Sequence, residues 1–165
     1  MKWDELGDQQ CAIARFLSVV GDRWTLLILS DSFLGVRRFE TFKSRLGISR
    51  TILTQRLSDL CDEGVLERVA YQQQPVRYEY KLTEKGLGLY PVMMAMTTWA
   101  NEHYADEGGP PILFNHTECS KDFTPDVKCS ECGEPVQVWE VSARKRPPMP
   151  HLPPVLRGPV EEKTG

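Results

Sequence analysis

The sequence predicts a mainly α-helical domain that carries one small β-hairpin. Two observations indicate this fold class. Apolar residues recur at intervals of three and four in several segments between residues 8 and 62, which is the spacing of amphipathic helices. After Gly64 the spacing changes to two over residues 66–82, as in a pair of strands, and helical spacing returns after Thr83.

The composition limits the class of protein. The chain has 165 residues, 41% of them hydrophobic and 26% charged, which is enough apolar material for about one domain. No stretch approaches the roughly 20 consecutive apolar residues that cross a bilayer, and residues 1–5 do not begin a secretory signal. Five is an odd number of cysteines, and with no secretory signal in view it favours free thiols or metal ligands over a disulfide framework. We therefore expect a cytoplasmic protein with no membrane partner.

The first two helices are predicted from their caps. Asp8 can cap a helix over residues 8–20. Asp22 can cap the next helix, in which residues 24–29 are apolar on nearly all sides, and Gly35 ends it. A helix of this kind is buried all round, so we expect it at the centre of the domain.

Two further segments predict a helix–turn–helix. Residues 38–46 form a short amphipathic helix, and Gly47 follows where a left-handed C-cap is expected. Ser49 can cap a second helix over residues 50–62, which Gly64 ends. The apolar residues of this second helix share one stripe: Leu53, Leu57, Leu60 and Cys61.

The hairpin and the last helix complete the domain. Residues 66–71 predict a strand, residues 72–75 a polar loop, and residues 77–82 a returning strand with one solvated face. Thr83 can cap a long helix to about residue 104, in which Pro91 predicts a kink.

The last helix carries more apolar surface than one stripe requires. The residues concerned are Leu87, Leu89, Tyr90, Met93, Met94, Met96, Trp99 and Ala100. Such a wide band predicts a long dimerisation helix that packs on its own domain and on a second copy. A fully buried helix of a monomer is the alternative.

Charge is distributed unevenly along the chain. The formal net charge is −3, but residues 37–85 hold ten Lys and Arg against seven acids. A basic segment in an acidic chain is typical of a local surface that binds a polyanion, and a fluctuation in an ordinary mixed surface is the alternative.

In this order the elements describe a winged helix-turn-helix, whose second helix enters the DNA major groove. The outer face of residues 50–62 offers hydroxyl, amide and guanidinium groups with no acid before Asp59, which suits base edges. The expected DNA contacts are Ser49, Arg50, Thr51, Thr54 and Gln55 on this helix, Arg37, Arg38 and Arg56 for phosphates, and Gln73 and Arg77 in the wing. An ordinary solvated helix face is the alternative.

Several motifs, in order over about residues 11–104, resemble the HxlR-type family of bacterial winged-helix transcription regulators. They are CAIAR at 11–15, GDRWTLLIL at 21–29, GVRRF at 35–39, GISR at 47–50 and RYEYKLTEKG at 77–86. The resemblance implies a homodimer with paired terminal helices and an operator of two related half-sites in double-stranded DNA. As a further partner we expect a small-molecule or redox inducer. We expect repression rather than activation.

Cys11 is a candidate sensor. It falls near the third position of a helix capped by Asp8, where the helix dipole stabilises a thiolate. Some members of the resembled family use a cysteine in this region to sense electrophiles or oxidants. A buried, small apolar residue is the alternative for Cys11.

The remaining cysteines suggest a metal site. His116 and Cys119 form one close pair, and Cys129 and Cys132 form a second, nine residues further on. Four nitrogen and sulfur ligands in two knuckle-like pairs fit a structural zinc ion, which would stabilise a segment too small for its own core. A loose tail with reduced thiols and a Cys129–Cys132 redox pair are the alternatives.

Three parts of the chain are therefore expected. Residues 1–105 form the winged helix-turn-helix domain with its dimerisation helices, residues 106–143 form the small zinc-binding Cys/His segment, and residues 144–165 form a proline-rich disordered tail. No GxSxG motif, phosphate loop or paired carboxylates indicate an enzyme. We predict a dimeric DNA-binding transcription regulator, and a protein–protein adaptor without DNA readout is the alternative.

Overall fold

A computed structural model describes residues 11–142, which form two compact units. The first unit runs to Ile112 and the second begins at Leu113. The predicted cap Asp8 and the predicted tail at residues 144–165 lie outside the described residues.

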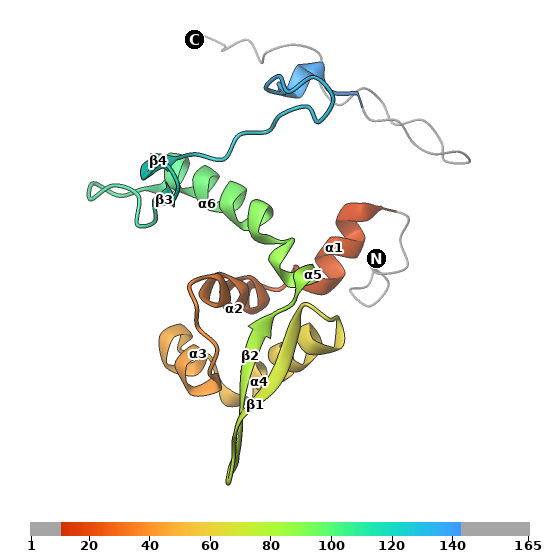
Figure 1. The fold of residues 1–165 in the computed structure, drawn as a ribbon, viewed down its shortest axis with the longest axis vertical. Helices are drawn as coiled ribbons and strands as arrows, with labels where there is room; N and C mark the ends of the chain where they lie inside the picture. The colour runs from red at the N-terminus through yellow and green to blue at the C-terminus, as the bar shows by residue number, and fades with distance from the viewer. Residues whose placement is uncertain (1–10, 143–165) are drawn as a thin grey trace, which may run out of the picture. The chain divides into compact units, whose positions relative to one another are not determined.

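The first unit is mainly helical and carries one antiparallel hairpin (Figure 1), so this part of the prediction is confirmed. Its elements are α1 (Ala12–Val20), α2 (Arg23–Phe33), α3 (Phe39–Leu46), α4 (Arg50–Asp62), β1 (Leu66–Gln73), β2 (Val76–Leu82), α5 (Glu84–Leu87) and α6 (Tyr90–Tyr104). Helices α2, α3 and α4 surround the core, and the hairpin projects away from them as a wing. This order is that of a winged helix-turn-helix.

The core of the first unit is aliphatic apart from one aromatic ring. Its buried members are Val20, Ile28, Leu29, Phe42, Ile48, Leu53, Leu57, Leu60, Val65 and Leu66. Helix α2 lies at its centre as predicted, but it is not buried all round, because Leu27 is 45% exposed. The stripe expected on the fourth helix is confirmed by the burial of all three of its leucines.

The predicted caps that lie in the described residues are present. The Asp22 carboxylate accepts hydrogen bonds from the backbone N–H groups of Trp24 and Thr25 at 2.9 and 3.3 Å. The Ser49 hydroxyl accepts one from the N–H of Ile52 at 3.3 Å. Gly47 has a φ of 62°, the left-handed conformation that glycine adopts at low cost after a helix.

An ion pair between α2 and α3, in which only the acid is nearly buried, was not predicted from the sequence. Arg45 donates from Nε and Nη2 to the carboxylate of Asp31 at 2.9–3.1 Å, and the Asp31 side chain is 8% exposed. Hydrogen bonding to Asp31, and its negative charge, raise the pKa of the Arg45 guanidinium above its usual value. The pair fixes α3 against the central helix.

Three predicted boundaries were wrong. The first helix begins at Ala12, so Cys11 is its N-cap rather than its third residue. The wing loop is shorter than predicted, because β1 runs to Gln73 and β2 starts at Val76. The backbone ladder continues there through polar residues, since strands exposed to water need no apolar side chains.

The long last helix was also predicted incorrectly. It is divided into α5, which ends at Leu87, and α6, which starts at Tyr90. Pro91 therefore lies in the first turn of a new helix, where its missing N–H leaves no intrahelical bond unmade. The Thr83 cap is confirmed by a 3.1 Å hydrogen bond from the N–H of Gly86.

The second unit has little regular structure. Strands β3 (Phe114–His116) and β4 (Lys121–Phe123) form a short antiparallel hairpin, and a 3-10 turn, η2, spans Val138–Glu140. None of residues 113–142 is buried. Within residues 11–142, no helix is long and apolar enough to span a membrane.

Candidate functional site

The outer face of α4 presents a compact set of polar side chains. The buried leucine stripe fixes the helix against the core, which leaves Arg50, Thr51, Thr54 and Gln55 exposed on the opposite side. Ser49, which caps the helix, is exposed beside them. The structure therefore brings the predicted base-contacting residues together on one accessible face at the N-terminal half of α4.

Two of these side chains already contact acids. The Arg50 guanidinium donates to Oε1 of Glu40 on α3 at 2.6 Å, and its central carbon lies 5.0 Å from the centroid of the Phe39 ring. Gln55 donates from Nε2 to the Asp59 carboxylate at 2.7 Å. Both acids would compete with a nucleic acid for the same donors. The contact with Glu40 joins two helices, so helical spacing within α4 does not predict it.

Arg56 lies in a different environment from the other arginines. Its Nε is 3.1 Å from the Asp22 carboxylate, its Nη1 is 3.1 Å from that of Asp59, and its side chain is only 33% exposed. Asp22 is also the cap of α2, so Arg56 links α4 to the start of the central helix.

Arg37 and Arg38 are positioned by the wing, although they precede α3. The N–H of Tyr80 on β2 donates to the carbonyl oxygen of Arg37 at 2.8 Å, and the backbone of Arg38 forms an isolated antiparallel β-bridge with that of Glu79. The Arg38 guanidinium carbon lies 4.8 Å from the centroid of the Tyr71 ring on β1. These contacts hold two exposed arginines between the helix–turn–helix and the wing.

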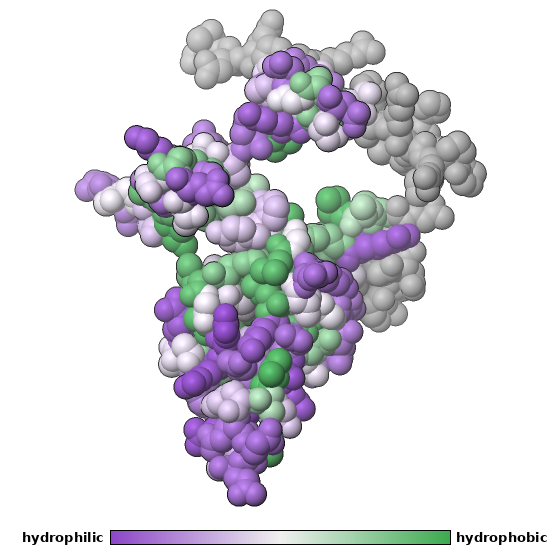
Figure 2. Space-filling model, viewed as in Figure 1, coloured by the Kyte–Doolittle hydropathy of each residue, from purple (hydrophilic) through white to green (hydrophobic). Residues whose placement is uncertain are grey.

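The wing itself is polar at its tip. Gln73 and Arg77 are exposed near the ends of β1 and β2, and Gln72 donates from Nε2 to the carbonyl oxygen of Gln74 at 2.9 Å. Figure 2 shows hydrophilic residues over the tip of the wing. Both predicted wing residues therefore lie at the part of the hairpin farthest from the core.

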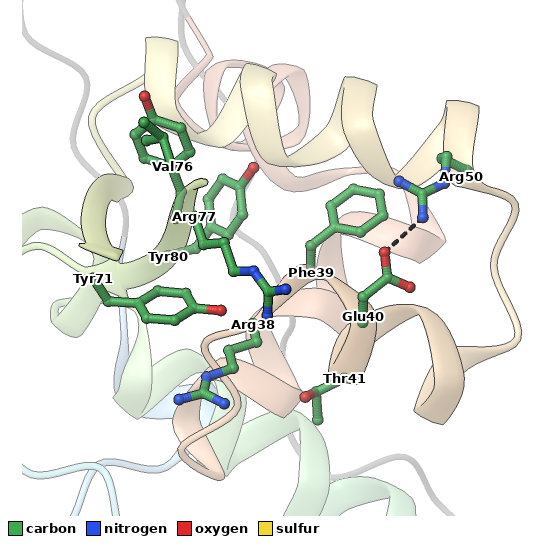
Figure 3. A pocket seen from close by; sticks show the side chains of 10 residues that line it. Arg38, Phe39, Glu40, Thr41, Arg50, Tyr71, Val76, Arg77 and Tyr80 are labelled. Carbon is green, nitrogen blue, oxygen red and sulfur yellow. Dashed lines mark hydrogen bonds and ion pairs between the residues drawn. The ribbon is translucent and has the colours of Figure 1, made fainter. Parts of the chain in front are cut away.

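A cavity of about 710 Å³ separates the wing from α3 and α4. Arg38 just before α3, Arg50 on α4 and Arg77 on β2 line it, together with the rings of Phe39, Tyr71 and Tyr80 (Figure 3). Glu40 is the acid among the lining residues. Three guanidinium groups against one carboxylate give the cavity a positive balance, which favours an anion such as a backbone phosphate.

Apolar side chains are exposed at the other end of the first unit. None of the residues of α6 is buried, and Met96 and Trp99 are 43% and 56% exposed. Ile13 on α1 and Leu87 on α5 are also exposed, at 66% and 55%. Figure 2 shows hydrophobic residues gathered where α1, α2 and α6 lie. The alternative of a buried monomer helix is therefore not what the structure shows.

The two cysteines of the first unit differ in exposure. Cys11 is exposed at the start of α1, which contradicts the alternative of a buried apolar residue. Cys61 is half-buried beside the core, and burial raises the pKa of its thiol.

The four predicted zinc ligands form two separate pairs in the second unit. His116 Nδ1 lies 3.3 Å from Cys119 Sγ. In the other pair, the pKa of the Cys129 thiol is lowered by backbone hydrogen bonds from Cys132 and Glu131. A side-chain hydrogen bond from Cys132 lowers it further. Across residues 11–142, no three His, Cys, Asp or Glu side chains are grouped closely enough to hold one ion.

The fold, together with the arginines beside α4 and the wing, defines the first unit as a winged helix-turn-helix protein. The chain belongs to the HxlR-like helix-turn-helix family, which it matches over residues 19–108. It is 40% identical over 139 residues to Rv3095, an uncharacterized HTH-type transcriptional regulator of Mycobacterium tuberculosis, with 84% of this chain and 85% of the relative covered. The chain is therefore a helix-turn-helix transcriptional regulator and not an enzyme.

Solved structures agree with this assignment. PA1607, a candidate transcription factor, matches with a TM-score of 0.76 and 28% identity over 85% of this chain and 98% of that chain. HypR, a redox regulator in its oxidized form, matches with a TM-score of 0.54 and 30% identity over 58% of this chain and all of its own.

Proposed function

We propose that the chain binds operator DNA as a homodimer and represses transcription, with α4 of each copy in the major groove of one half-site. The observation that carries this proposal is the exposed outer face of α4, where hydroxyl, amide and guanidinium groups are presented together. A dimer that covers an operator blocks transcription by occupying the DNA, without contacts to a further protein.

The side chains on α4 suit different bases. Arg50 can donate two hydrogen bonds to guanine, Gln55 can pair with adenine, and the methyl groups of Thr51 and Thr54 can pack on a thymine methyl. Arg50 and Gln55 must first exchange their acidic partners for DNA. Because both pairs are solvent-exposed, this exchange costs about 1 kcal/mol or less for each.

Phosphates would be held on both sides of α4. Ser49 and the first backbone N–H groups of the helix can bind one phosphate, and Arg37, Arg38 and Arg77 can bind others along the cavity beside the wing. Gln73 would reach the minor groove or the backbone from the wing tip. For Arg56, its two acidic partners favour a structural role over the phosphate contact that we expected from the sequence.

The homodimer is supported by the exposed apolar residues of α1, α5 and α6. A helix with a wide apolar band that buries none of its residues in its own subunit leaves an apolar surface that a second copy can cover. Two copies related by a twofold axis would place two α4 helices on one side of a duplex.

An inducer could act through Cys11. Its thiol is exposed next to α1, which belongs to the same apolar surface, and the matched structure HypR is a redox regulator. Oxidation or alkylation of Cys11 would thus change the packing between copies and the spacing of the two recognition helices.

Replacing Thr54 and Gln55 with alanine tests base readout. We expect operator affinity to fall about 10- to 100-fold while affinity for random DNA changes less than threefold, since a good base contact contributes about 1–3 kcal/mol of discrimination. Ser58→Ala, on the exposed side of the same helix but further from its N-terminus, is the matched control. An equal loss on operator and random DNA would exclude base readout, and no salt-dependent DNA affinity at all would favour the adaptor.

A further inference from the structure

Two turns in the second unit share one backbone pattern, 13 residues apart. The N–H of Ser120 donates to the carbonyl oxygen of His116 at 2.7 Å, and the N–H of Gly133 donates to that of Cys129 at 2.9 Å. Both donors are left-handed, with φ of 53° and 76°. Ser120 is the one non-glycine residue in the described chain with a positive φ, a conformation that L-residues rarely adopt without a local reason.

The segments beside these turns pair in the same register. Strands β3 and β4 place His116 opposite Lys121, and at the equivalent position the N–H of Cys129 donates to the carbonyl oxygen of Glu134 at 2.9 Å. The next pair outward also matches in both turns. Each turn is therefore the tip of a short antiparallel hairpin, with metal-binding side chains at its first and fourth residues.

The first turn holds its two candidate ligand atoms at nearly the separation that a zinc ion requires. Tetrahedral zinc with bonds of about 2.0–2.1 Å to nitrogen and about 2.3 Å to sulfur holds two such ligand atoms about 3.6 Å apart. His116 Nδ1 and Cys119 Sγ are 3.3 Å apart, within hydrogen-bond distance, and the His116 ring centroid lies 6.2 Å from that of Phe123 on β4. The turn therefore holds the two atoms close to the separation that zinc would impose.

We propose that His116, Cys119, Cys129 and Cys132 bind one structural zinc ion per chain, and that the ion draws the two hairpins together. The two pairs are apart in the structure, so the segment between the hairpins must bend. This segment comprises only residues 124–127, which extend at most about 14 Å. Because none of residues 113–142 is buried, the metal would supply stability that the unit lacks.

The filled coordination sphere also defines the role of the ion. With four protein ligands, no position remains for a water molecule or a substrate, so the ion would be structural rather than catalytic.

The alignment with Rv3095 covers 139 residues, and it must therefore include part of the second unit. At least part of the segment that carries the two hairpins is thus aligned with this relative, in addition to the winged helix-turn-helix.

Metal content of the full-length protein tests this proposal. After purification under reducing conditions and dialysis with zinc, elemental analysis should give about one zinc ion per chain. Replacing the zinc with cobalt should give the visible absorption of a tetrahedral site with three thiolate ligands. About half an ion per chain, no bound metal, or a Cys129–Cys132 disulfide in the reduced preparation would overturn the proposal.

Single substitutions identify the ligands. Cys119→Ser, Cys129→Ser, Cys132→Ser and His116→Asn should each lower the zinc content at least fivefold, whereas Cys11→Ser, at the exposed cysteine of the first unit, should leave it unchanged. Helical circular dichroism should stay the same in every variant, because no ligand lies in the helices. In the unsubstituted protein, chelation of zinc should increase proteolysis within residues 113–142 at least fivefold. Unchanged cleavage, or zinc retained in any of the three cysteine variants, would contradict the proposal.

Discussion

Arg50 at the first residue of α4 donates to Glu40 on the first turn of α3, with 2.6 Å between Nη2 and Oε1. The Arg50 and Glu40 side chains are 63% and 68% exposed, so the pair is open to solvent at the N-terminus of α4. It contributes less than about 1 kcal/mol to folding at this exposure. The pair instead affects DNA binding, because Glu40 contacts the arginine that we expect to donate to a base.

Glu40→Gln should therefore strengthen DNA binding without changing stability. Removing one negative charge beside the phosphates and freeing Arg50 should raise affinity about two- to fivefold at low salt, equivalent to roughly 0.5–1 kcal/mol. Fluorescence anisotropy with a labelled duplex measures this change.

Asp62→Asn is the matched control for Glu40→Gln. It removes one exposed charge at the opposite end of α4, 12 residues or about 18 Å from Arg50 along the helix axis, and should leave affinity within twofold. If Glu40→Gln weakened DNA binding, the pair would have to be a positioning contact that the bound state keeps.

The Asp31–Arg45 pair predicts an asymmetric loss of stability. Arg45→Met leaves the nearly buried Asp31 carboxylate without its partner and should lower the free energy of unfolding by about 2–3 kcal/mol. Asp31→Asn should cost about 1 kcal/mol, because the Arg45 side chain is 49% exposed and can be hydrated. Urea unfolding at one fixed chain concentration compares them, and equal losses would show that burial of Asp31 does not determine the cost.

Met96→Glu should convert the proposed dimer into a monomer. The substitution places a charge on α6 within the apolar surface that we expect the second copy to cover. Sedimentation velocity should show the mass fall by half, while Val76→Glu, at a similarly exposed apolar residue of the wing, should leave it unchanged. A monomeric unsubstituted protein at DNA-binding concentrations would exclude the proposed assembly.

Alkylation of Cys11 should lower operator affinity at least fivefold. Cys119 and Cys132 are also exposed, so the comparison must separate the sites. Cys11→Ser keeps the size of the side chain, and its DNA binding should not respond to the reagent. A response of the same size in Cys11→Ser would assign the effect to other cysteines and remove Cys11 as the sensor.

Local features of the fold could be predicted from the sequence because they depend on neighbouring residues. The Asp22 and Ser49 caps and the leucine stripe of α4 all follow from residues within one or two turns. The position of Pro91 illustrates the limit, because the residue predicts a disturbance but does not distinguish a kink from a new helix. The new helix starts at Tyr90, whose ring centroid lies 4.8 Å from that of Phe33, a residue far away in the sequence.

Contacts between distant segments could not be predicted in this way. Arg38 lies against Tyr71, and Arg45 pairs with Asp31, only because the fold brings these elements together. The four side chains of α4 that we expect to contact bases share one exposed face, but the acidic partners of Arg50 and Gln55 were not foreseen. Glu40 is a residue that helical spacing alone marks as an ordinary first-turn acid.

Selection of bound sequences from a random pool of duplex DNA tests the central claim most directly. If two α4 helices are related by a twofold axis, the selection should enrich an inverted repeat. Its half-sites should be centred about 10 bp, or a multiple of this distance, apart. The enrichment should disappear when Thr54 and Gln55 are both replaced with alanine. Recovery of no motif, or of a single asymmetric site bound by one chain, would contradict the account.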